Sequence, residues 1–101
     1  MRIGGQESTY KPIIRESQGL IFIRLAPGKY AFLRYSVNEG KMFINEAYTP
    51  EEYRGRGLAT KLMGAAVSYA KERNLKIIPV CSFARHYLNK HPELSNLFEQ
   101  A

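Results

Sequence analysis

The chain has 101 residues, enough for one domain and too few for two, so we expect a single domain over residues 1–101. Hydrophobic residues make up 45% and aromatic residues 12%, which argues against disorder, and no apolar run approaches the roughly 20 residues that span a bilayer. The net charge of +6 favours anionic partners, yet residues 1–50 hold seven Lys/Arg against four Glu and residues 51–101 hold eight against five, which excludes a basic tail.

The first half of the chain reads as strands joined by tight turns. Residues 1–19 are polar and rich in turn formers, which predicts an N-terminal arm with room for one strand at 10–15. The turns are expected where Gly, Pro and Asn gather, at 26–29 and 38–40. Three β-rich runs lie at 20–25, 30–37 and 42–48. Short strands with tight turns predict an antiparallel meander.

After Pro50 the apolar residues change from the period of a strand to that of a helix, which predicts a helix over 57–73. It should end near Asn74, a residue that tolerates the left-handed conformation of a helix cap. A short buried strand is expected at 75–80. Because the helix provides a long crossover, this strand should pair in parallel with 42–48.

Two further helices are predicted at the C-terminal end, at 82–90 and 92–99. Ser82 is a suitable cap for the first, and Pro92 suits the first position of the second. The expected fold class is therefore α+β, with a mixed sheet whose antiparallel meander is followed by a β-α-β crossover and C-terminal helices.

A Gly-rich turn precedes the predicted helix 57–73. A helix start offers backbone N–H groups without partners and the positive end of the helix dipole, and phosphates bind there. Glycines let the backbone approach an anion, and arginines add forked donors that match phosphate oxygens. The residues expected to bind an anion are Arg54, Gly55, Arg56, Gly57, Leu58, Ala59 and Thr60. Taken alone, a Gly-x-Gly pattern is more often a turn that needs glycine for geometry only.

The stretch 54–59 is similar to the Arg/Gln-x-x-Gly-x-Gly/Ala signature of the GNAT superfamily of N-acetyltransferases. Residues 45–93 also resemble the small single-domain GNAT-like proteins of the YjdJ/NATD1 type, with Cys81 after the last strand and Lys90-His91-Pro92-Glu93 near the end. The resemblance implies that acetyl-CoA or CoA binds, with its pyrophosphate on 54–60 and its pantetheine between two separating strands. It implies acetyl transfer to an amine of a small molecule or a protein. Acyl-CoA binding without catalysis is the alternative.

Two residues are candidates for the chemistry. Cys81 is expected at the start of the helix 82–90, where it is either a packing residue or, as the resemblance implies, a catalytic one. Glu46 is the only acidic residue of its strand. In a regular strand it shares a face with Ile44 and Tyr48, so it is either a partly buried base or an exposed, solvated carboxylate. Proteins of this type often carry His at this position.

The remaining candidates receive structural interpretations. Tyr87 is expected to pack in the core, His86 to lie on the surface, and His91 to cap or pack near Pro92. The histidines lack a second ligand at metal spacing, so no metal site is expected. A single cysteine forms no internal disulfide, and the N-terminus lacks the apolar stretch of a signal peptide, so we expect a cytoplasmic protein. We also expect a monomer or at most a weak dimer.

Nucleic-acid binding is the other alternative, because the chain is basic and rich in tyrosine. Such a role needs aromatic and basic side chains interleaved on one strand face. Tyr30, Phe32, Arg34 and Ser36 offer only one basic residue in that arrangement. Nucleic acid is therefore not expected as the partner.

Overall fold

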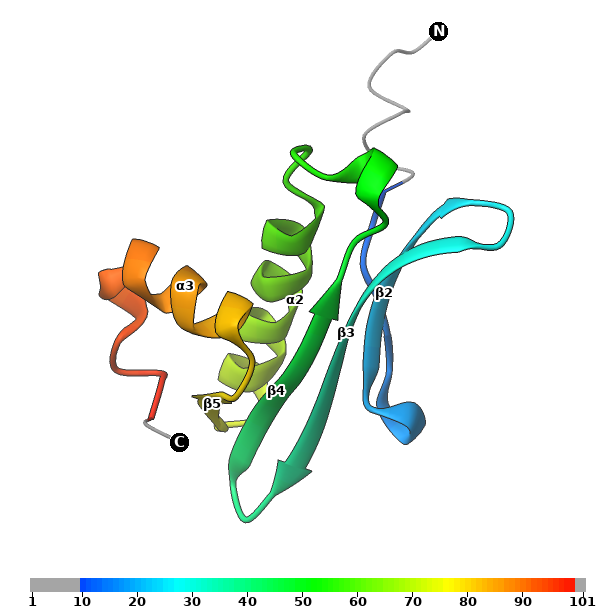
Figure 1. Cartoon of the computed structure of the whole chain (residues 1–101). Helices are drawn as coiled ribbons and strands as arrows, with labels where there is room; N and C mark the ends of the chain where they lie inside the picture. The colour runs from blue at the N-terminus through cyan, green and yellow to red at the C-terminus, as the bar shows by residue number, and fades with distance from the viewer. Residues whose placement is uncertain (1–9, 100–101) are drawn as a thin grey trace, which may run out of the picture.

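The computed structural model describes residues 10–99, so the predicted N-terminal arm is seen only from Tyr10 onward, and residues 1–9 lie outside the described part. Figure 1 shows the elements in the order β1 (Ile13–Arg15), η1 (Glu16–Gln18), β2 (Leu20–Ala26), β3 (Lys29–Asn38), β4 (Lys41–Tyr48), η2 (Glu51–Tyr53), α2 (Leu58–Glu72), β5 (Lys76–Pro79), α3 (Ser82–Lys90) and η3 (Pro92–Leu94). The η elements are single 3-10 turns. The predicted strands and the first two predicted helices are confirmed, although β1 fills only part of 10–15.

Within residues 10–99 the strands form one five-stranded sheet in the order β1-β2-β3-β4-β5. The first four pair antiparallel, as the predicted meander requires. β4 and β5 pair in parallel, from Lys41 opposite Lys76 to Ile44 opposite Pro79. Asn74, with a φ of 57°, ends α2 as expected and lets the chain reverse into β5. The α+β class with one β-α-β crossover is confirmed.

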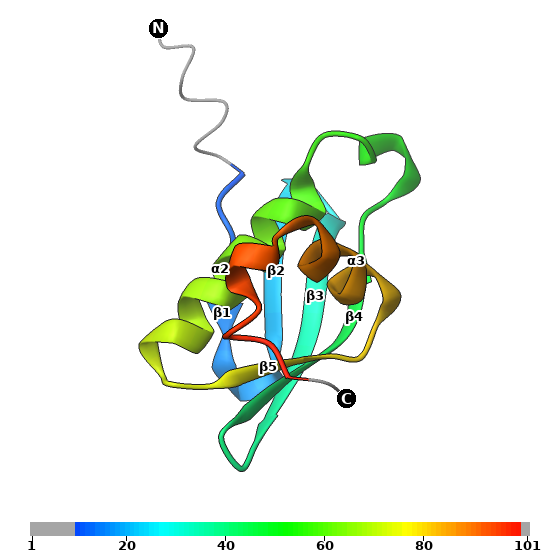
Figure 2. The same ribbon diagram turned by 90° about the vertical axis from the view of Figure 1, so that its left-hand side faces the viewer.

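Both helices lie on one side of the sheet, which we call its inner face, and the opposite side is the outer face (Figure 2). Because strand side chains alternate, every second residue of β2 and β3 reaches the inner face, and Ile21, Ile23 and Leu33 are fully buried there. The apolar stripe of α2, which includes Leu62 and Ala66, packs on them. Within residues 10–99 no polar or charged residue is buried. The hydrophobic core therefore lies wholly between the helices and the inner face.

β4 contains a β-bulge at Asn45. Arg34 of β3 pairs with Glu46, whereas the next residue of β3, Tyr35, pairs with Ile44, so Asn45 is the extra residue. An extra residue shifts the alternation of side chains, because successive strand residues point to opposite faces. Ile44 is therefore fully buried on the inner face, while Glu46 is exposed on the outer face.

The predicted helix over 92–99 is wrong beyond its first turn. Pro92–Leu94 form only the 3-10 turn η3, and the chain then lies along β5. The backbone N–H of Ile77 donates to the carbonyl of Leu97 at 2.8 Å, and the N–H of Glu99 donates to the carbonyl of Ile77 at 2.8 Å. These bonds provide partners for the backbone N–H and C=O groups of Ile77 at the free edge of β5. A helix over 92–99 would leave these groups unpaired.

Within residues 10–99, neither α-helix has the length and apolar character that crossing a membrane requires.

Candidate active site

The candidate site lies where β4 and β5 separate. Their pairing ends at Ile44 and Pro79. Beyond these residues β4 continues to Tyr48, whereas the segment after β5 turns into α3. The carbonyl oxygen of Ile44 closes the pairing, because it accepts hydrogen bonds from the backbone N–H of Val80 at 3.1 Å and of Cys81 at 3.0 Å. The predicted pair of parallel strands that part from one another is confirmed.

α2 begins at the end of the sheet toward which β4 and β5 run (Figure 1). Its first internal hydrogen bond runs from the N–H of Lys61 to the carbonyl of Gly57 at 3.1 Å. The N–H groups of Leu58, Ala59 and Thr60 therefore precede the hydrogen-bonded ladder, and no side chain caps this end of the helix. Together with the positive end of the helix dipole, these donors form a site suited to an anion.

The glycines before α2 are required by backbone conformation. Gly55 and Gly57 have φ angles of 84° and 76°, in the left-handed region that side chains other than glycine rarely adopt. A Cβ atom at either position would meet no atom within 4 Å, so packing does not exclude a side chain. The positive φ of Gly57 turns the chain directly into the first turn of the helix, where Leu58 is buried.

A pocket of about 210 Å³ lies against this helix start. Its lining residues are Thr49, Tyr53, Arg54, Gly55, Gly57, Leu58, Ala59 and Thr60. Six of the seven residues predicted from the sequence are thus brought together, and Arg56 is the exception. Thr49 and Tyr53 were not predicted, because nothing in the sequence shows that the 3-10 turn η2 folds the loop back onto the helix start.

The two arginines of this loop play different parts. Arg54 donates from Nε to the carbonyl of Thr49 at 3.1 Å, which braces the loop and leaves its terminal nitrogens for other partners. The guanidinium of Arg56 lies over the ring of Tyr53, 5.0 Å from its centre. Both side chains are exposed, so both contribute positive charge at the helix start.

Cys81 lies at the opening between the strands, at the residue that precedes α3. Its carbonyl accepts the first hydrogen bond of that helix, from the N–H of Arg85 at 3.3 Å, and its side chain makes no capping bond. The half-buried thiol packs against the edge of the core. The side chain of Arg85 folds back along α3, and its guanidinium donates to the carbonyls of Val80 at 2.9 Å and Pro79 at 3.3 Å.

Of the two alternatives for Glu46, the structure has the exposed carboxylate, and the expectation that Glu46 shares a face with Ile44 is wrong. The bulge at Asn45 places Glu46 on the outer face, where its side chain is 54% exposed. There its carboxylate forms an ion pair with Nε of Arg34 at 3.4 Å. Its backbone lies two residues beyond Ile44, where β4 no longer pairs with β5.

The aromatic residues of α3 have structural roles. Tyr87 is half-buried, and burial, with a smaller effect of the Glu93 carboxylate, raises the pKa of its phenol. Its ring packs 4.3 Å from the ring of His91, centre to centre, and Nδ1 of His91 lies 3.2 Å from Glu93. His86 is exposed. These findings confirm the packing role predicted for Tyr87 and His91 and the surface position of His86.

Residues 10–99 contain no group of three His, Cys, Asp or Glu side chains able to hold a metal ion. The groups found near the separation of β4 and β5 are a set of N–H donors at the start of α2, a thiol before α3, and an exposed carboxylate on the outer face of β4. Such a set can hold a phosphorylated thioester and accept a proton from an attacking amine.

The sequence is similar to those of known proteins. The family profile described as GCN5-related N-acetyl-transferase matches residues 21–97. The chain is 34% identical over 55 residues to Protein NATD1 of Gallus gallus and of Mus musculus, which is 52% of this chain and 50% of each relative. The match to human NATD1 has the same identity and covers 49% of that protein, so the aligned part spans about half the length of these relatives.

The fold is also that of a solved structure. The solution structure of a GCN5-like protein from Staphylococcus aureus superposes with a TM-score of 0.74 and 29% sequence identity, covering 93% of this chain and 92% of the other. Because the family profile spans most of the chain and includes both the α2 start and Cys81, the chain belongs to the GCN5-related N-acetyltransferase family.

Proposed function

We propose that the chain is an N-acetyltransferase that binds acetyl-CoA and transfers its acetyl group to an amine. The observation that carries this proposal is the start of α2, where two glycines of positive φ and three unpaired N–H groups face a pocket beside the separation of β4 and β5. In the family to which the chain belongs, such a turn receives the pyrophosphate of CoA. We assign this role to Arg54, Gly55, Gly57 and the N–H groups of 58–60, with Arg56 as an additional charge.

The remaining residues supply the chemistry. Glu46 accepts the proton of the amine as the nitrogen forms its bond to the acetyl carbonyl carbon. The carbon–sulfur bond of the thioester breaks, and the thiolate of CoA leaves and takes a proton from solvent. Cys81 is positioned to contact the thioester, either as a polar neighbour or as a nucleophile that carries the acetyl group in between. Its own N–H is bonded to Ile44, and we assign stabilisation of the carbonyl oxygen to the free N–H groups in the first turn of α3.

Binding of acyl-CoA without turnover is the second candidate function. The observation in its favour is the exposed, Arg34-paired state of Glu46, which lacks the buried surroundings that many catalytic carboxylates have. Release of CoA from acetyl-CoA in the presence of a panel of amines separates the two functions, because a binding module gives none. The lone thiol of Cys81 fits a reducing compartment, and we propose the cytoplasm.

Calorimetry with CoA tests the cofactor site directly. Gly57→Val forces a β-branched residue into a left-handed conformation and redirects the N–H donors, so CoA affinity should fall below detection. Gly64→Ala is the matched control: Gly64 lies inside α2, a Cβ there meets no atom within 4 Å, and affinity should be unchanged.

Circular dichroism must show that both glycine variants remain folded. Should Gly57→Val unfold, Gly55→Ala tests the same loop with a smaller side chain. Wild-type affinity in a folded Gly57→Val or Gly55→Ala variant contradicts the site.

A further inference from the structure

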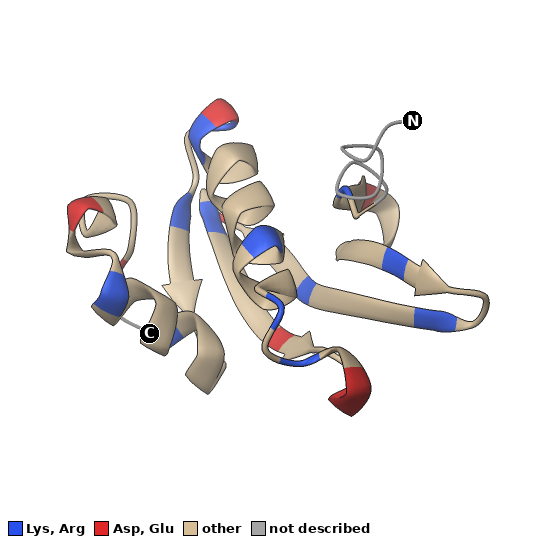
Figure 3. Ribbon diagram, turned by 90° about the horizontal axis from the view of Figure 1, so that it is seen from above, with Lys and Arg blue, Asp and Glu red and all other residues tan. Residues whose placement is uncertain are grey.

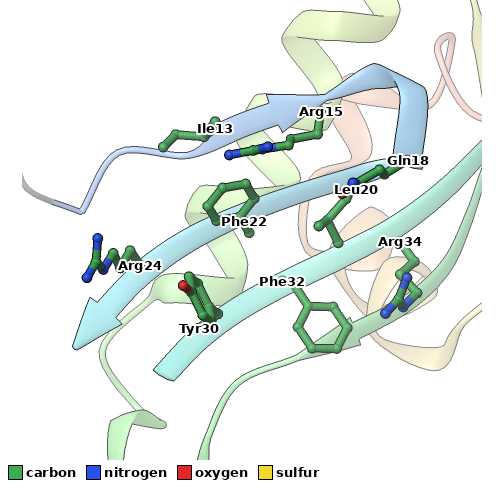
Figure 4. A pocket seen from close by; sticks show the side chains of 9 residues that line it. All are labelled: Ile13, Arg15, Gln18, Leu20, Phe22, Arg24, Tyr30, Phe32 and Arg34. Carbon is green, nitrogen blue, oxygen red and sulfur yellow. The ribbon is translucent and has the colours of Figure 1, made fainter. Parts of the chain in front are cut away.

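The outer face of the sheet carries a groove of about 430 Å³. Figure 4 shows its side chains rising from β1, β2 and β3 toward the same side. The helices of the described chain lie on the inner face, so none of them covers this groove (Figure 2). The volume is in the range of small-molecule and peptide sites.

The floor of the groove is a row of apolar side chains. The pairing of the strands places Ile13 opposite Phe22, Phe22 opposite Phe32 and Phe32 opposite Tyr48. Both phenylalanines are half-buried and Tyr48 is exposed, so each ring keeps free surface. A continuous apolar strip therefore crosses the outer face from β1 to β4.

Arginines surround this strip. Arg15, Arg24 and Arg34 all line the groove, and the guanidinium groups of Arg15 and Arg34 lie 5.4 Å and 5.2 Å from the centres of the Phe22 and Phe32 rings. Only Arg34 has an acidic partner; within residues 10–99 no salt bridge is formed by Arg15 or Arg24. In Figure 3 basic residues lie along the strands, while the acidic residues lie mainly in loops and at element ends.

One row of paired residues links the groove to β4, the strand that borders the candidate active site. Arg15, Leu20, Arg34 and Glu46 form one row across the four strands. Glu46 stands at the active-site end of that row and Arg15 at the far end. Strands lie about 4.8 Å apart, so the row spans roughly 14 Å, the length of about four extended residues.

We propose that this groove binds the acetyl acceptor, and that the acceptor is an acidic peptide with a free amino terminus. Glu46 receives the amino terminus and takes its proton as the neutral amine attacks, the phenylalanine strip receives an apolar residue, and Arg15 and Arg24 receive carboxylates farther along. The inference rests on the proposed acetyltransferase function and names its substrate class. Like charges repel across a contact, so the same arginines disfavour a lysine-rich acceptor and a second copy of this basic face.

Kinetics with a matched pair of peptides tests the proposal. Acetylation of Ala-Phe-Glu-Glu should be preferred over that of Ala-Phe-Lys-Lys in kcat/KM. The double variant Arg15→Glu and Arg24→Glu should raise KM for the acidic peptide about tenfold and reverse the preference, as expected for a few exposed charge contacts. Lys71→Glu, a charge reversal on α2, is the control and should change neither peptide's KM.

A second readout does not depend on turnover. Titration of isotope-labelled protein with each peptide should shift the amide signals of β1 to β3 for the acidic peptide and leave them unshifted in the double variant. Equal affinity for both peptides, or no shift on the outer face, overturns the inference. Groove binding of a thymidine decamer in preference to the peptide overturns it in favour of nucleic acid, and self-association through this face overturns it in favour of a second copy.

The two proposals fail in distinguishable ways. If the wild-type protein does not bind CoA, or turns over with none of the amines, the proposed function is contradicted. Turnover with amines that ignores peptide charge and the double variant contradicts only the acceptor class.

Discussion

The two α-helices begin at the same end of the sheet, and their first turns are built in opposite ways. α2 is preceded by Gly57 in the left-handed region and by an exposed loop with two arginines. α3 is preceded by Cys81 in an extended conformation, with φ of −83° and ψ of 158°, whose N–H is bonded to Ile44. Neither helix has a side-chain cap, so both leave first-turn N–H groups unpaired.

In the proposed function, the α2 start binds the cofactor phosphates and the α3 start holds the thiol beside the thioester. The α2 start is open and positively charged, which suits a phosphate that stays hydrated on one side. The α3 start is tied to β4 through one carbonyl and holds its thiol against the core, which suits a fixed position near a reacting bond. Four tests compare the two helices, in order of decreasing expected effect.

Leu58→Ala should give the largest loss of stability. Leu58 is 3% exposed and anchors the first turn of α2 in the core, so its truncation should cost about 2–5 kcal/mol in the free energy of unfolding. Ala84→Gly, at a fully buried position in the first turn of α3, should cost about 1–2 kcal/mol because less volume is removed. Urea denaturation measures both, and an equal loss would show that the two starts are anchored alike.

Cys81→Ala should lower kcat for acetyl transfer about a hundredfold while leaving CoA affinity within about twofold. Gly57→Val should instead abolish CoA binding. Steady-state kinetics and calorimetry on the same preparations measure the two quantities. Full activity in Cys81→Ala would show that this cysteine only packs, and that the α3 start has no separate role in acetyl transfer.

Substitution by serine should have opposite signs at the two helix starts. Cys81 has the extended conformation of an N-cap, so Cys81→Ser supplies a capping oxygen and should stabilise the protein by about 0.5–1 kcal/mol. Gly57→Ser places a side chain at a φ of 76° and should destabilise it by about 1–2 kcal/mol. Thermal melts of both variants decide, and stabilisation in both cases would mean that backbone conformation does not distinguish them.

The smallest effect concerns alkaline pH. Burial raises the pKa of Tyr87 on α3, so the folded protein keeps this proton at pH values where the unfolded chain loses it. Its contribution to stability is therefore complete below the ordinary tyrosine pKa of about 10 and is lost as pH rises above it. Tyr87→Phe should flatten the fall of stability above about pH 10, which urea denaturation at increasing pH measures.

Local features were predictable from the sequence. The helix at 58–72, its end at Asn74, the strands and most of the α2 pocket follow from side-chain period and from glycine chemistry, which act within a few residues. The face occupied by Glu46 was not predictable, because the bulge at Asn45 exists only in the pairing of two strands. The basic groove was missed for the same reason, since Arg15, Arg24 and Arg34 become neighbours only across the sheet.

The C-terminal segment failed for a related reason. Residues 92–99 have the composition of a short helix. In the folded protein, however, the unpaired edge of β5 lies beside them, and Leu97 and Glu99 form hydrogen bonds with Ile77 there. Strand-edge competition is a tertiary effect that no local period reports.

The single extra residue in β4 also defines how this strand tolerates changes in length. Removing Asn45 would restore strict alternation without moving its neighbours to the other face: Glu46 would stay on the outer side and Ala47 on the inner side. Removing a regularly paired residue such as Phe43 would instead exchange the faces of the strand residues on one side of the deletion. An insertion in the loop after Tyr48 has no such phase to disturb, so length variation should be far better tolerated there.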